Sequence, residues 1–148
     1  FTNTPLGPPA AVAEATTPFD LDTAGVSRTI GVAGKVNGGF YQLSIPRREK
    51  ILQDKQEIPP SMGVSTAINF QPTGVGKAAI TGDFVLLGRE VNPVLYTLGQ
   101  NGIKVTAIHS HMIGEQPPIY FMHFWAVADA QHIARGLRAA LARTGSKR

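Results

Sequence analysis

The sequence predicts an α+β domain in which about three helices pack on a largely antiparallel sheet. Residues 34–91 read as consecutive short strands with turn residues between them. Helix-start residues stand before this block, at its end and near the end of the chain. The expected order is helix, four strands, helix, two strands, helix, and the last two strands form a β-hairpin that carries histidines.

The first predicted helix lies within residues 19–31, with Asp20 or Asp22 as its N-cap. Val26 and Ile30 are spaced so that they face inward.

The strand block divides into four segments. Residues 34–47 contain an Asn-Gly-Gly turn followed by a run that alternates between apolar and polar residues. Residues 50–60 carry charges and end in two prolines, which is typical of an edge strand. Residues 64–72 and 77–91 read as two further strands, separated by the turn residues 73–76.

Two more helices follow. Asn92–Pro93 predicts a helix start, because Asn caps and Pro tolerates the first helical position, and Asn101–Gly102 predicts its end. Asp129 is the expected cap of the last helix, which has Ile or Leu at every fourth position.

The composition indicates one domain with a substantial core. Of its 148 residues, 43% are hydrophobic and 16% are charged, and the charged share is below the roughly 25% of typical globular proteins. The net charge of +4 comes without a dense basic stripe, so we expect no nucleic-acid partner. With no cysteine, disulfides, thiolate ligands and cysteine nucleophiles are excluded. No apolar run reaches the ~20 residues of a transmembrane helix.

Residues 1–18 are rich in Pro, Ala and Thr and lack hydrophobic periodicity, so they are expected to form a flexible leader before a single domain at 19–148. The stretch is similar to what remains after a signal peptide is removed. We therefore expect a periplasmic or secreted mature protein; an artificial start of the chain is the alternative.

Three of the four histidines, His109, His111 and His123, fall within fifteen positions. The first two share a face of one predicted strand, and His123 lies on the next. A hairpin register that pairs His109 with His123 puts all three on one face. Such a set suits a divalent transition metal, with zinc expected first and copper as the alternative.

The neighbours of these histidines on both strands are mainly apolar. We therefore expect a water-poor wall, with Phe121 and Trp125 as core residues. Neutral imidazoles buried together are costly unless they are hydrogen-bonded or bind a metal. The alternative to a metal centre is a set of hydrogen-bonded core or groove histidines.

Five charged residues are further candidates, each with a structural alternative. Glu115, in the predicted loop, is a fourth ligand or general base, or is simply solvated. Glu90 is a catalytic carboxylate or stabilises a helix start through its dipole. Asp83 is a turn or bulge residue or a site carboxylate. Arg47 and Arg48 bind an anionic substrate group, or form a solvated strand end.

Several segments together resemble the DUF1259 family, also called LppY/LpqO-like, over about residues 20–143. They are IPRREKI, MGVSTAINFQP, ITGDFVLLGREVNPV, NGIKVTAIHSHMIGEQPPIYFMHFWAVADA and ARGLRAAL. The most specific part is His-x-His, then the Glu115 loop, then Phe-Met-His. Family members typically read His-Asn-His, whereas this chain reads His-Ser-His and has an extra residue before the loop proline. The family has no assigned function. Many of its members are exported, often as lipoproteins, and many carry two copies of the domain, whereas this sequence shows one copy and no cysteine to lipidate. The resemblance therefore implies export in soluble form and locates the site at the histidines.

Three functions follow from these observations. The first is metal-assisted hydrolysis of a small-molecule or anionic substrate, in which zinc lowers the pKa of its water and a Glu takes the proton. The second is a non-catalytic metal carrier or sensor, for copper with Met112 or Met122 as a soft ligand. The third is a metal-free module that binds a small molecule or an envelope component in an aromatic, His-lined groove.

Overall fold

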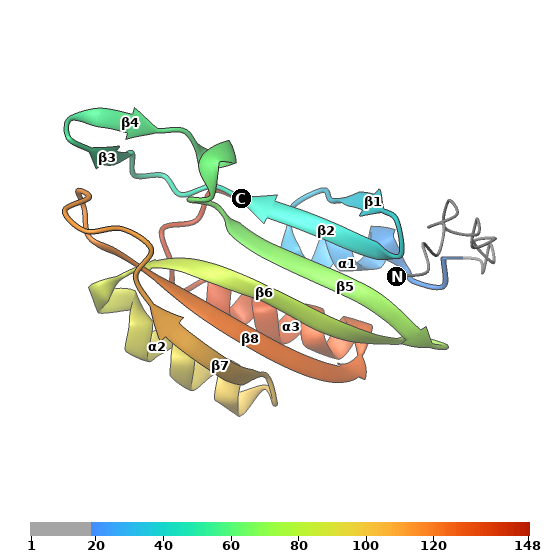
Figure 1. The fold of residues 1–148 in the computed structure, drawn as a ribbon. Helices are drawn as coiled ribbons and strands as arrows, with labels where there is room; N and C mark the ends of the chain where they lie inside the picture. The colour runs from blue at the N-terminus through green and yellow to red at the C-terminus, as the bar shows by residue number, and fades with distance from the viewer. Residues whose placement is uncertain (1–18) are drawn as a thin grey trace, which may run out of the picture.

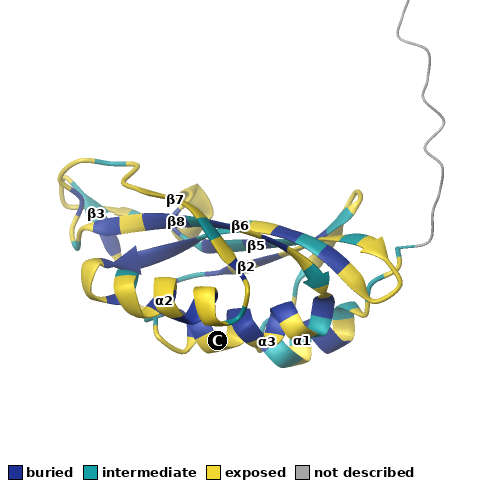
Figure 2. Cartoon of the chain, turned by 90° about the horizontal axis from the view of Figure 1, so that it is seen from below, coloured by how far each residue is buried: buried dark blue, intermediate teal, exposed yellow. Residues whose placement is uncertain are grey.

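The computed structural model describes residues 19–148, and the predicted leader lies outside this range. The described chain forms a six-stranded antiparallel sheet, a separate two-stranded hairpin, and three α-helices gathered on one face of the sheet (Figure 1 and Figure 2). The predicted α+β class is confirmed. The elements are, in order, α1 (Thr23–Ile30), β1 (Lys35–Asn37), β2 (Phe40–Ile45), β3 (Ile51–Gln53), β4 (Gln56–Ile58), the 3-10 turn η1 (Pro60–Met62), β5 (Thr66–Gly74), β6 (Lys77–Leu87), α2 (Gly88–Gln100), β7 (Lys104–His109), β8 (Ile119–Asp129) and α3 (Ala130–Leu141).

The strand order in the main sheet is β1-β2-β5-β6-β8-β7. The central strands β6 and β8 are 11 residues each and pair along their whole length, from Lys77 opposite Asp129 to Leu87 opposite Ile119. Every neighbouring pair is antiparallel. A strand that alternates across this sheet therefore places every second side chain under the helices and the others on the opposite face.

The main core lies between the sheet and the helices. On β6, Ile80, Phe84 and Leu86 are fully buried on the helix side. The helices begin where the sequence predicts for α1 and α3: Asp22 accepts a hydrogen bond from the Gly25 amide at 2.9 Å, and Asp129 accepts one from the His132 amide at 2.7 Å. These caps satisfy amides that the first helical turn leaves without intrahelical partners.

The predicted start of α2 at Asn92–Pro93 is wrong, because the helix begins at Gly88 and contains Pro93. Glu90, in the first turn, accepts a hydrogen bond from the Leu87 amide at 2.8 Å and so caps the helix from within. The helix ends at Gln100, and Gly102 (φ 72°) follows in the left-handed conformation, as the Asn-Gly pair predicts.

The sequence predicts an edge strand over residues 50–60. These residues instead form the hairpin β3–β4, which is separate from the main sheet. Its turn residues Asp54 and Lys55 both have positive φ, 49° and 68°. Two consecutive residues of this kind make a tight hairpin turn, which without a glycine is not recognisable from the sequence.

This hairpin covers one end of the face opposite the helices. A second buried cluster forms beneath it, made of Ile51, Val64, Val85, Leu87, Ile119 and Phe121. The rest of that face, here called the open face, has no helix over it among the described residues (Figure 2). It carries Phe40, Ala67, Asn69, Ala79, Thr81, Asp83, His123 and Trp125.

Candidate metal centre

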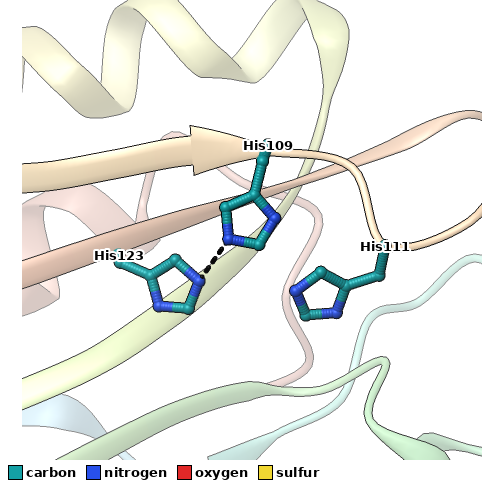
Figure 3. A group of neighbouring side chains, drawn as sticks. All are labelled: His109, His111 and His123. Carbon is teal, nitrogen blue, oxygen red and sulfur yellow. Dashed lines mark hydrogen bonds between the residues drawn. The ribbon is translucent and has the colours of Figure 1, made fainter.

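Three imidazoles converge where the open face meets the covered end. His109 is the last residue of β7, His111 lies in the β7–β8 loop, and His123 is in the middle of β8 (Figure 3). The Nε2 atoms of His109 and His123 are 2.8 Å apart. One ligand atom from each of the three residues lies within 4.8 Å of the others. The expected grouping of these histidines, the histidine cluster, is therefore present.

The predicted hairpin register is wrong by two residues. His109 lies opposite Phe121, and His123 lies opposite Ala107, with a bulge between Val105 and Ala107. A shift of two residues keeps every side chain on its face, whereas a shift of one would have reversed it. The histidines consequently still share a face. Val105, on the other side of the bulge, packs against the helix-side core.

The predicted water-poor wall is also wrong. His109 and His111 are exposed and His123 is half-buried, because no helix covers this face. Phe121 is buried as expected, and the His111 ring stacks on it with centroids 3.6 Å apart. Trp125, expected in the core, is 45% exposed on the open face.

Two of the imidazoles are hydrogen-bonded to each other, and the neutral form of the third is favoured. In the His109–His123 hydrogen bond one ring nitrogen donates and the other accepts. Desolvation lowers the pKa of His111, and the neighbouring His109 and His123 lower it further against the attraction of Asp83. Neutral imidazole is the form that binds a metal.

Asp83 is the carboxylate that faces this cluster. It lies on β6 directly opposite His123, and its pKa is raised by burial against the opposing influence of His123, His111, a backbone hydrogen bond at Ala67, and His109. Its pairing with Ala67 and His123 is regular, so the interpretation as a turn or bulge residue is wrong. The cross-strand register places Asp83 beside the histidine cluster, where a carboxylate of the candidate site would lie.

Glu115 lies in the loop that carries His111. Its side chain is buried, and its Oε1 accepts a hydrogen bond from the Ile119 amide at 2.9 Å. The interpretation as a solvated loop Glu is therefore wrong. The group of residues able to share one metal ion, within the described range, consists of the three histidines and does not include Glu115.

Arg47 and Glu90 are joined to each other. Two guanidinium nitrogens of Arg47 donate to the two Glu90 oxygens at 2.8 and 3.0 Å, and Nη1 also donates to the Val85 carbonyl at 2.7 Å. The Gly145 amide donates to Glu90 at 2.9 Å. Both side chains are buried, so the interpretation of Arg47 as part of a solvated strand end is wrong. This pair ties the end of β2 to the start of α2 and to the C-terminal segment.

Arg48 lies outside that pair. Its backbone amide donates to the Gly145 carbonyl at 2.9 Å, and its side chain lines a hollow of about 180 Å³ with charges of both signs, including Lys50, Glu57 and Lys147. Arg48 is exposed at this strand end, so of the two arginines Arg47 alone belongs to the buried hydrogen-bonded pair.

Next to the histidine cluster, the open face is hollowed. A groove of about 560 Å³ is lined by ten residues from β5, β6, β7 and β8: Ala67, Asn69, Thr81, Gly82, Asp83, Thr106, Ala107, His123, Phe124 and Trp125. A second hollow of about 190 Å³ shares Asn69, Thr81 and Trp125 with it. The larger hollow is shallow and open to solvent, and it borders the histidine cluster at His123.

The fold and this site define a histidine-bearing α+β domain. Residues 24–143 match the family described as Domain of Unknown Function (DUF1259), and the chain belongs to that family, as the resemblance predicts. Comparisons with curated proteins and with solved structures found no match. Within residues 19–148, no helix combines the length and the apolar character needed to cross a membrane.

Proposed function

We propose that this domain binds one divalent transition metal ion through His109, His111 and His123. The convergence of three imidazoles to within 4.8 Å is the observation that carries the proposal. Three nitrogen ligands are a common set for zinc, and they leave a fourth position for water or substrate.

The distances fit after small movements. Zn–N bonds of about 2.05 Å in a tetrahedral site place ligand nitrogens about 3.3 Å apart. The His109–His123 separation of 2.8 Å must then widen slightly, and His111 must move inward from a separation of up to 4.8 Å. His111 is exposed and lies in a loop, so its side chain has room to make that movement.

Nitrogen-only ligation favours zinc over copper(I). Met122 is fully buried on the helix side of the sheet, and Met112 packs against the second buried cluster. A copper carrier would use a soft sulfur ligand at the site. Carrier and sensor functions therefore rank below a zinc centre with an open position.

The activity that we propose is metal-assisted hydrolysis. Zinc supplies Lewis acidity and lowers the pKa of a coordinated water to about 7. Asp83 takes the role of proton acceptor that the sequence interpretation gave to Glu115, because Asp83 faces the histidines whereas Glu115 holds the Ile119 amide. Arg47 is bonded to Glu90 and has no part in this step. The proposed location, periplasmic or secreted, rests on the resemblance to exported relatives.

The test is metal content by mass spectrometry on untagged protein after reconstitution with zinc. We expect about one zinc per chain, lost in His109→Ala and in His123→Ala. His132→Ala is the matched control, since that exposed histidine lies on α3 and contributes only its backbone amide to the helix cap. Wild type without stoichiometric metal, or single variants that retain it, would overturn the proposal.

A further inference from the structure

We propose that the open face binds a neutral saccharide along the groove that ends at the histidine cluster. The two hollows, of about 560 and 190 Å³, adjoin each other, since Asn69, Thr81 and Trp125 line both. The larger hollow reaches Asp83 and His123. The groove therefore leads from the aromatic residues on β2 and β8 to the candidate metal centre.

The charge of the groove disfavours an anionic ligand. Among the described residues that line the two hollows there is no Lys or Arg, and the one ionisable acid is Asp83. Phosphate and carboxylate groups are normally held by guanidinium or ammonium donors. An anion in these two hollows would meet no Lys or Arg among the residues that line them and would be repelled by Asp83, while Lys104 lies opposite Trp125 on the edge strand β7.

The polar side chains disfavour a purely apolar ligand. Asn69, Gln71, Thr81 and Asp83 all line the hollows, and covering them with a hydrocarbon chain would leave their hydrogen-bonding groups without partners. Gln42 donates to the Asn69 carbonyl oxygen at 3.0 Å, which leaves the Asn69 amide nitrogen to donate to a ligand. These side chains therefore favour a ligand with many hydroxyl groups, because a hydroxyl group can both donate and accept hydrogen bonds.

Trp125 supplies an aromatic surface on which a sugar ring can pack. It is 45% exposed and lines both hollows, with Phe40 at the far end of the smaller one. Ala67, Ala79 and Ala107 line the same face, so small side chains leave room beside the indole ring. A pyranose ring presents a C–H face that packs on an aromatic ring and hydroxyl edges that bond to amide and carboxylate groups.

This assignment rests on the proposed function only for the reaction, in which the bound saccharide would be the substrate of the histidine centre. Binding itself needs the groove alone. Saccharide affinity and metal content are therefore separate measurements, and one can fail without the other.

Trp125 is the chain's single tryptophan, so intrinsic fluorescence reports on the groove directly. The probes are chitotetraose, cellotetraose and maltotetraose, each titrated to about 10 mM into chelator-treated protein and into zinc-reconstituted protein, with tetragalacturonate as the anionic counterpart. We expect at least one neutral tetrasaccharide to shift the emission saturably in both preparations, and tetragalacturonate to bind chelator-treated protein at least about tenfold more weakly.

Two variants measured by calorimetry complete the test. Trp125→Ala is expected to weaken binding about tenfold or more, whereas Tyr96→Ala, which removes a 68% exposed aromatic from α2, leaves it unchanged. Circular dichroism confirms that both variants are folded. The inference is overturned if no neutral probe binds, if tetragalacturonate binds chelator-treated protein better than the neutral probes do, or if folded Trp125→Ala binds as well as wild type.

Discussion

The buried Arg47–Glu90 pair makes the sharpest stability prediction. Glu90 receives two hydrogen bonds from Arg47 and one each from the amides of Leu87 and Gly145. Arg47→Met keeps most of the side-chain volume but leaves the carboxylate buried without its counter-charge. Breaking a buried pair from one side typically costs about 3–5 kcal/mol, a large part of the 5–15 kcal/mol that stabilises an ordinary domain.

The assay is urea unfolding followed by far-UV circular dichroism. The exposed pair Lys50–Glu57 is the control, because its Nζ–O distance is also 2.8 Å but both side chains are largely exposed, at 73% and 45%. Lys50→Met should leave the unfolding midpoint unchanged, since exposed ion pairs contribute little. If Arg47→Met lowers the free energy of unfolding by less than about 1 kcal/mol, the Arg47–Glu90 pair does not hold the end of β2, the start of α2 and the C-terminal segment together.

Three further predictions concern pH, packing and metal. Burial pushes the pKa of Glu90 upward, but the Arg47 hydrogen bond, the amides of Leu87 and Gly145 and the Arg47 charge outweigh burial and hold this pKa below its ordinary value. The stability that Glu90 contributes is therefore full above the unfolded pKa of about 4.3 and falls as the pH drops below it. Urea unfolding between about pH 3 and about pH 6 will detect this loss, and a flat profile would contradict it. Gly82→Ala should lower the free energy of unfolding in urea by about 1–3 kcal/mol, because the new Cβ would collide with the Ala67 carbonyl. Gly99→Ala is the control and should not destabilise the protein, because nothing lies within 4 Å of its new Cβ. Equal effects of the two substitutions would refute the steric argument. Zinc at about 100 times its dissociation constant should stabilise the wild type by about 2.7 kcal/mol at about pH 7.5 and by less at about pH 5.5, because protons compete with the metal for imidazole nitrogens. Calorimetric scans that show the same stabilisation at both pH values would refute histidine ligation.

The sequence predicts those parts of the fold and site that depend on local chemistry. The caps at Asp22 and Asp129 are recognisable because a short acidic side chain before an amphipathic run satisfies free amides. Strand side chains alternate with a period of two. The prediction that His109 and His123 share a face is therefore correct even though the predicted register is wrong by two residues.

Long-range pairing limits what the sequence predicts. The bulge before Ala107 sets which residues of β7 and β8 lie opposite each other, and no turn residue identifies it. Asp83 enters the site only through its pairing with His123, forty residues away in the chain. The burial of Glu90 depends on Arg47, from a distant strand end, and the exposure of Trp125 depends on which face the helices cover.

The position of His111 shows the same limit at the site itself. It follows the end of β7, so the strand ladder does not place it; the loop that carries it is held instead by the β3–β4 hairpin. The amides of Leu52 and Gln116 each donate to the other's carbonyl oxygen at 2.8 Å, and Gln53 Nε2 donates to the Ile113 carbonyl at 3.3 Å. Backbone hydrogen bonds impose no residue pattern, so the sequence cannot reveal this contact. The hairpin therefore helps to position His111, and its stability sets how well His111 is held beside His109 and His123.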